Sequence, residues 1–109
     1  MSNFLHLDQL ESKTLFPGFH ARMVHTDGLT IAHFRIEKGC ILPLHDHPHE
    51  QVSNIIEGTL EMTVGGETLA CKPGTVVTIP GNTPHSARAL TDCYVVDIFR
   101  PAREDYRRS

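Results

Sequence analysis

The sequence predicts an all-β domain, an antiparallel sandwich or barrel, and three observations support this fold class. Turn-forming dipeptides recur along the chain, among them Pro17-Gly18, Gly65-Gly66 and Pro80-Gly81. Between such turns lie runs of four to nine residues rich in Val, Ile, Thr and Phe, a composition typical of strands. No window of useful length keeps a helical period, apart from a weak turn around "LDQLESK". Short strands at regular spacing therefore favour a two-layered β architecture.

The expected strands are, in chain order, residues 29–37, 51–57, 59–64, 67–71, 75–79 and 93–99. Leu60, Met62 and Val64 alternate with polar residues, which is the period of a strand with one buried face. Gly65-Gly66 then predicts a tight hairpin into the next strand.

The chain has the length and composition of one domain, with 109 residues, 39% of them hydrophobic and 21% charged. We expect residues 1–18 to form an N-terminal arm, residues 19–100 the barrel and residues 101–109 a solvated C-terminal tail. Strands 51–57 and 93–99 have two partly apolar faces, more than one small barrel can bury. This excess of apolar surface predicts a homodimer.

Several classes of partner are not expected. A formal net charge of −3 gives no electrostatic reason to expect nucleic acid as a partner. No apolar run approaches the roughly 20 residues of a membrane helix, and the first residues lack the order of a signal peptide. Three widely spaced cysteines without a CxxC pair, Cys40, Cys71 and Cys93, indicate reduced thiols and a cytoplasmic protein.

The stretch "LHDHPHEQ" suggests a metal site. His45 and His47 are two residues apart on an expected strand, so their side chains project to the same side. That strand should end at Pro48, which cannot continue a central ladder. The chain re-enters a strand at Gln51, and His85 follows the rigid loop "PGNTP". Three imidazoles and one side-chain oxygen suit one divalent transition metal, which could be Ni, Zn, Fe, Co or Mn.

Two segments resemble the motifs of the cupin family. Residues 39–58, "GCILPLHDHPHEQVSNIIEG", match a first motif of Gly, five residues, HxH, three residues, an acid, six residues and Gly. Residues 74–85, "GTVVTIPGNTPH", match a second motif of Gly, five residues, Pro and a His five positions after the proline. The resemblance implies a jelly-roll β-barrel and a metal bound by His45, His47, Gln51 and His85.

The sequence departs from these motifs at two positions. Asn82 replaces a usual glycine, a mild change because Asn tolerates left-handed backbone. Gln51 stands where glutamate is usual. Glu50 is an alternative ligand, but it is one residue away, so its side chain would point to the opposite face of the strand. With Gln51 the ligand set is neutral and leaves the metal's charge free to polarise a bound anion. The usual oxygenase set contains a carboxylate, so neutral ligands favour isomerisation of a carboxylated substrate.

Asp97 is a candidate proton-transfer group. In "CYVVDIF" it shares a strand face with Val95 and Phe99, so it would lie among apolar side chains if that face is the barrel interior. The alternative is a solvated aspartate on an edge strand. Arg103 could clamp a substrate carboxylate bidentately, or it could be an arginine of the tail.

"HPHEQ" together with "DIFRPAREDY" is similar to the small cupins of pectin and alginate breakdown, which open and ketonise 4,5-unsaturated uronates. The resemblance implies that Asp97 is the acid/base and that Phe99 and Arg103 contact the substrate. The sequence therefore predicts a metal-dependent enzyme acting on a small carboxylated sugar derivative. A metal-dependent dioxygenase and a non-catalytic small-molecule-binding cupin remain as alternatives.

Overall fold

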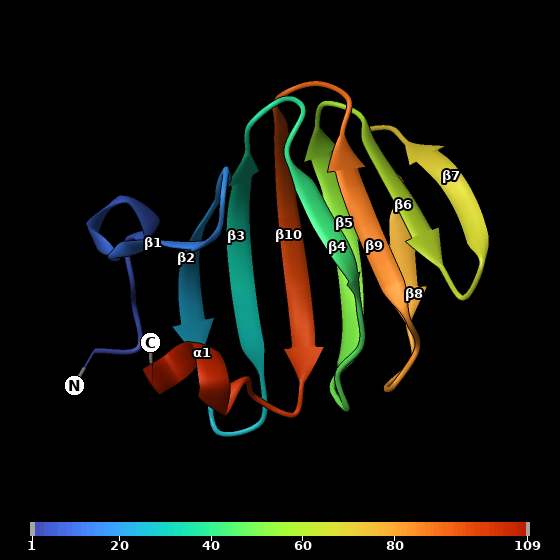
Figure 1. Cartoon of the computed structure of the whole chain (residues 1–109). Helices are drawn as coiled ribbons and strands as arrows, with labels where there is room; N and C mark the ends of the chain where they lie inside the picture. Colours follow the sequence, from blue (N-terminus) through green and yellow to red (C-terminus); the bar gives the residue numbers. More distant parts are fainter. Residues whose placement is uncertain (1, 109) are drawn as a thin grey trace.

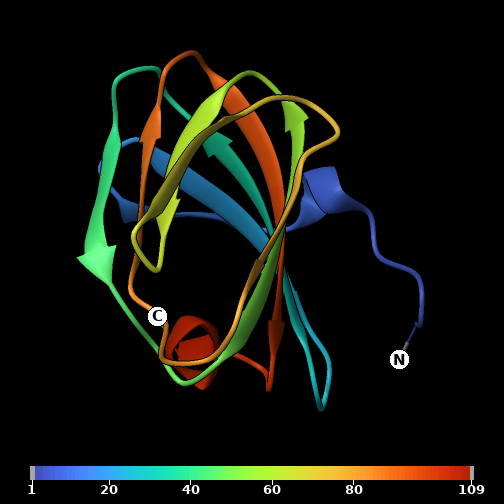
Figure 2. The same ribbon diagram turned by 90° about the vertical axis from the view of Figure 1, so that its right-hand side faces the viewer.

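The computed structural model describes residues 2–108 of the chain, which fold into two antiparallel β-sheets. The larger sheet contains, in spatial order, β1 (Ser12–Phe16), β2 (Phe19–His25), β3 (Thr30–Ile36), β10 (Cys93–Arg100), β5 (Glu50–Glu57) and β8 (Val76–Ile79). The smaller sheet contains β4 (Ile41–His45), β9 (His85–Ala89), β6 (Leu60–Val64) and β7 (Glu67–Cys71). Figure 2 shows the strands wrapped around a common interior, which confirms the predicted jelly-roll barrel.

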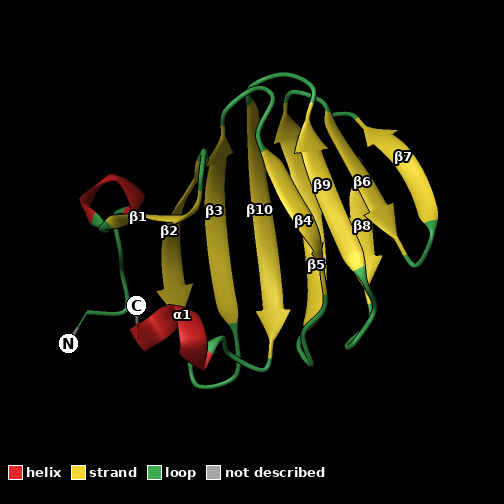
Figure 3. Ribbon diagram, in the orientation of Figure 1, coloured by secondary structure: helices red, strands yellow, loops and turns green. Residues whose placement is uncertain are grey.

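Among the described residues, helical structure is confined to two short segments, a 3-10 turn η1 (Leu7–Gln9) and a C-terminal helix α1 (Glu104–Arg108) (Figure 3). No helix within residues 2–108 is long and apolar enough to cross a membrane. The three cysteines are free thiols, as expected. All six strands expected from the sequence are present, with ends that differ by one residue at most.

The barrel interior is filled by alternate residues of facing strands, as in any sheet with one buried side. In β10, Val95 lies opposite Phe34 of β3 and Asp97 lies opposite Ala32, and all four side chains are buried. Because side chains alternate along β10, Asp97 points into the interior between Val95 and Phe99. A buried carboxylate at this position requires a polar partner or a function.

The strand that begins the histidine-rich stretch is shorter than expected. β4 ends at His45, and His47 lies in the loop that follows instead of on the strand. The reason is a competing backbone partner: the His47 carbonyl accepts a hydrogen bond of 2.7 Å from the N–H of Asn82, in the loop between β8 and β9. This bond fastens the two motif loops together.

The C-terminal segment was expected to be a solvated tail, but part of its described residues 101–108 packs against the barrel. Ala102 and Arg103 are each only 6% exposed, and the Arg103 N–H donates a hydrogen bond of 2.8 Å to Thr30 Oγ1. Tyr106 packs edge-on against Phe99, with ring centroids 5.8 Å apart. α1 therefore lies against the ends of the large sheet (Figure 1). At the other end of the chain, β1 adds an edge strand from the predicted arm.

Candidate metal centre and active site

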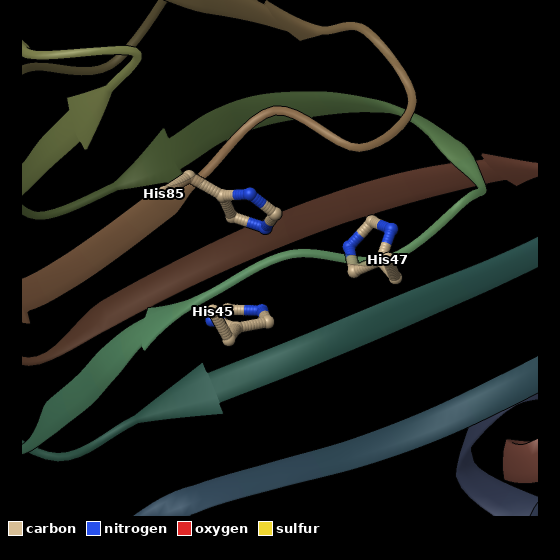
Figure 4. A group of neighbouring side chains, drawn as sticks. All are labelled: His45, His47 and His85. Carbon is tan, nitrogen blue, oxygen red and sulfur yellow. The ribbon is translucent and has the colours of Figure 1, made fainter.

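Three histidines from the two motif segments, residues 39–58 and 74–85, converge in the barrel. His45 ends β4, His47 follows it, and His85 begins β9, directly opposite His45 in the β4–β9 pair. Their candidate ligand atoms all lie within 4.8 Å of one another. The ring centroids of His45 and His85 are 4.3 Å apart, and Figure 4 shows the three rings directed toward a shared space. The structure thus brings together the three histidines that the sequence selected.

Backbone hydrogen bonds set the tautomer of each of these rings. In each histidine Nδ1 lies within 3.0 Å of a carbonyl oxygen, that of Pro43, His49 or Thr83 for His45, His47 and His85 respectively. A carbonyl oxygen only accepts, so Nδ1 carries the proton and Nε2 presents a lone pair. The Nε2 atom of His85 is buried and has no hydrogen-bond partner. Histidines held in this way are typical metal ligands.

Gln51 supplies a fourth electron-pair donor beside these rings. Its side chain is buried on the inner face of β5, with Oε1 3.1 Å from Nε2 of His47. Because the His47 proton is on Nδ1, two lone pairs face each other at this distance, which is unfavourable unless a cation lies beside them. Glu50, the alternative ligand, is exposed and pairs with Arg100 at 3.2 Å. The donor set therefore fits a divalent transition metal bound by three imidazoles and an amide oxygen.

The surroundings of His47 and His85 favour the neutral form of both imidazole rings. Burial lowers the pKa of His47, and the positive charge of Arg103 lowers that pKa further. Burial also lowers the pKa of His85. Both rings are consequently neutral at neutral pH, which is the protonation state that a metal ligand requires.

Asp97 lies next to this cluster and is connected to it by Gln51. The Gln51 amide donates from Nε2 to Asp97 Oδ2 at 3.2 Å and to Ser53 Oγ at 3.0 Å. The second oxygen of Asp97, Oδ1, is buried without a hydrogen-bond partner. Burial raises the pKa of Asp97 to about 7, although the Ser53 hydroxyl and the Arg103 charge oppose this. The carboxyl group can therefore hold or release a proton near neutral pH.

A cavity in the barrel joins these groups. Its wall includes the three histidines, Gln51 and Asp97, together with Phe99 and many apolar side chains. Tyr106 of α1 also lines it, a residue that the sequence analysis missed. The only signal for Tyr106 was an aromatic residue in a segment taken as a tail, which would not have singled it out.

Arg103 stacks on two aromatic residues of the cavity wall. Its guanidinium carbon lies 3.9 Å from the ring centroid of Tyr106 and 4.8 Å from that of Phe99. Nε and Nη2 both donate to the carboxylate of Asp105, whereas Nη1 is buried and has no hydrogen-bond partner. The structure therefore places Arg103 beside Phe99, next to the cavity.

Residues 32–99 match the family model of the cupin domain, and the chain belongs to the cupin family. KdgF from Halomonas sp. has a solved structure that is 28% identical, with a TM-score of 0.90, covering 97% of this chain and 99% of that one. An RmlC-like cupin from Shewanella frigidimarina NCIMB 400 is also 28% identical, with a TM-score of 0.91 over 97% and 96% of the two chains. These structures confirm the resemblance to small single-domain cupins.

Larger cupin enzymes share the fold alone. Variants of salicylate 1,2-dioxygenase from Pseudoaminobacter salicylatoxidans and oxalate decarboxylase from Bacillus subtilis are 20% identical to this chain, with TM-scores of 0.74 and 0.79. The chain spans only 28% and 29% of their lengths. Together the cupin fold and the histidine cluster support a metal-binding cupin with a small-molecule cavity.

Proposed function

We propose that this cupin binds one divalent transition metal and ring-opens and ketonises unsaturated uronates or a similar small carboxylated sugar derivative. The proposed metal ligands are His45, His47, Gln51 and His85. One observation carries the proposal: Gln51 contacts both the histidine cluster, through Oε1, and the buried Asp97 carboxyl, through Nε2. The resemblance to the uronate-ketonising small cupins, with KdgF as a structural neighbour over nearly the whole chain, supports the substrate class.

The metal would contribute Lewis-acid polarisation of the substrate oxygens. The proposed ligands are three neutral imidazoles and one neutral amide, so no ligand charge offsets that effect. The backbone carbonyls that accept from Nδ1 of each histidine hold the rings in the orientation required.

Asp97 is the proposed proton-transfer residue. Ketonisation removes a proton from an enol oxygen and adds one to carbon, with no net change in composition. Gln51 fixes Oδ2 of Asp97, and Oδ1 is left without a partner in the interior. We assign the proton exchange with substrate to Oδ1. The apolar wall around the carboxyl group excludes bulk water from this step.

Phe99 and Arg103 are the proposed substrate contacts. Phe99 lines the cavity, and the Arg103 guanidinium lies over its ring. The unengaged Nη1 of Arg103 can donate to a substrate carboxylate in a charge-assisted hydrogen bond.

The test is incubation of the metal-loaded protein with an unsaturated galacturonate produced by a polysaccharide lyase, following loss of the conjugated absorbance. We expect acceleration over uncatalysed ring opening, with no oxygen consumed. His47→Ala should lose both the acceleration and the metal, as measured by elemental analysis. No acceleration with Ni, Zn, Fe, Co or Mn would contradict the proposal, and stoichiometric oxygen uptake would favour a dioxygenase.

A further inference from the structure

Arg103 and Asp105 form a bidentate ion pair at the start of α1. Nε of Arg103 donates to Oδ1 of Asp105 at 3.0 Å, and Nη2 donates to Oδ2 at 2.8 Å. The arginine side chain is only 8% exposed, whereas that of Asp105 is 56% exposed. The aspartate therefore reaches the buried guanidinium from the solvent side. Two parallel charge-assisted hydrogen bonds fix the orientation of the guanidinium plane as well as its position.

This ion pair leaves one nitrogen of Arg103 unused. Nη1 is buried and has no hydrogen-bond partner, a costly state for a charged donor unless a ligand satisfies it. The guanidinium carbon lies within 4.8 Å of the ring centroids of Phe99 and Tyr106, both of which line the cavity. The Arg103 charge also lowers the pKa of His47 and of Asp97, so its field reaches a proposed metal ligand and the proposed proton-transfer residue.

The backbone of Arg103 is fixed from a second direction. Its N–H donates to Oγ1 of Thr30, a fully buried residue at the start of β3. The segment is thus anchored at the backbone by β3 and at the guanidinium by Asp105. Between these two anchors the long side chain has few rotamers left to lose when a ligand binds.

We propose that Asp105 is a positioning residue, which holds the Arg103 guanidinium against the rings of Phe99 and Tyr106 so that Nη1 can be presented to the carboxylate of a sugar acid in the cavity that these rings line. The inference rests on the proposed function, in which Arg103 binds that carboxylate. The hydrogen bonds from Arg103 hold the pKa of Asp105 below its usual range, so the pair stays ionised at neutral pH.

The opposite role would be competition, in which Asp105 occupies the arginine that the substrate needs. The geometry favours positioning, because Asp105 takes Nε and Nη2 and leaves Nη1 free. The two roles predict opposite effects of Asp105→Asn: a weaker complex if Asp105 positions Arg103, and a tighter complex if it competes.

The experiment uses the metal-loaded full-length chain with Asp105→Asn, Arg103→Ala and the double variant. Two quantities are measured: Kd for galacturonate, a saturated uronate, by calorimetry, and KM and kcat for unsaturated galacturonate. Asp105→Asn should raise Kd and KM about 3- to 10-fold and leave kcat nearly unchanged. The increase reflects the entropy lost when the ligand must immobilise the Arg103 side chain that Asp105 no longer holds. In the Arg103→Ala background, Asp105→Asn should have no further effect, because it acts through that arginine.

Glu104→Gln is the matched control, because Glu104 is an exposed acid of the same helix that pairs with Arg107. It should leave Kd, KM and kcat at parent values. Asp105→Glu keeps the charge and should recover part of the lost affinity, which a purely structural defect of α1 would not predict. Far-ultraviolet circular dichroism and thermal melting of each variant check that the fold is kept.

Four outcomes decide the inference. An unchanged or lower Kd in Asp105→Asn, with Arg103→Ala weakened, would overturn positioning and leave the proposed function intact. An additive loss in the double variant would also overturn it. Unchanged binding in Arg103→Ala would remove both the inference and the proposed substrate contact. If both single variants weaken galacturonate binding but the parent does not ketonise the unsaturated sugar, the positioning role stands and the proposed reaction fails.

Discussion

Gly81→Ala should loosen the candidate metal centre without changing any of its ligands. Gly81 lies in the loop between β8 and β9, where a Cβ atom would lie well under 3.0 Å from the carbonyl oxygen of Pro48. Pro48 belongs to the loop between β4 and β5, next to His47. The adjacent Asn82 N–H donates to the His47 carbonyl at 2.7 Å. The absence of a side chain at position 81 thus allows the β4–β5 loop and the β8–β9 loop to touch through their backbones.

The size of the effect follows from that contact. Ordinary contacts of a Cβ atom begin at 3.4 Å, so the loops would have to separate by roughly 1 Å. The atoms that clash are backbone atoms, which cannot swing aside as a flexible side chain can. Overpacking of this kind costs about 1–3 kcal/mol of folding free energy. Displacing the support of metal ligands typically lowers metal affinity about 10- to 100-fold, and we expect a loss in this range.

Competition with a fluorescent chelator measures the metal affinity, and urea unfolding of the metal-free protein measures the stability. Gly28→Ala is the control, because a Cβ there meets no atom within 4 Å and its φ is not positive. That variant should match the parent in both assays. Parent-like metal affinity in Gly81→Ala would refute the view that contact between the two loops holds His47 and His85 in register.

Three further predictions concern Asp97 and the outer sheet face. Asp97→Asn should keep the bound metal, since Asp97 is not a proposed ligand, but lose about 100- to 10,000-fold in turnover; parent-like turnover would exclude the proton-transfer role. The pKa of Asp97 is about 7 in the folded protein and 3.8 ordinarily, so the folded state binds this proton more tightly than the unfolded chain does. The unfolding free energy of the metal-free protein should therefore fall by up to about 4 kcal/mol between about pH 4 and pH 7, and the Asn variant should lack that component in urea titrations. We also propose a homodimer, because Ile56 and Val76 are 47% and 58% exposed on the outer face of the large sheet; a monomer mass by light scattering at micromolar concentration would contradict this.

The histidine cluster could be predicted from the sequence even though one step of the reasoning was wrong. Strand alternation was the expected reason for His45 and His47 to point the same way, but β4 ends at His45. The rings converge because Asn82 holds the His47 carbonyl from the opposite loop. The motif spacing predicted that the histidines converge, but it did not indicate the contact between Asn82 and His47. For Asp97, alternation correctly grouped the residue with Val95 and Phe99, but it left open whether that strand face is the interior, and the structure shows that it is.

The C-terminal helix could not be predicted from local pattern. An isolated helix of five residues does not form in water, so α1 depends on contacts made elsewhere in the fold. Its anchor is Thr30, 73 residues before Arg103 in the chain. Nothing in the sequence around either residue indicates that they meet. Tyr106 could not be predicted for the same reason, because its position in the cavity wall depends on the contact between Arg103 and Thr30.

The two polar atoms of the Gln51 amide explain why glutamine suits this position better than glutamate. A glutamate there would present only acceptor oxygens, both to the histidine cluster and to Asp97. Two carboxylates at the 3.2 Å separation of Gln51 Nε2 and Asp97 Oδ2 could not both ionise, so one would take up a proton. The amide avoids this conflict, because Oε1 offers a lone pair on the His47 side while Nε2 donates to Asp97 and Ser53. Glutamine therefore offers the proposed metal a neutral oxygen and places no second carboxyl group beside Asp97, the proposed proton-transfer residue.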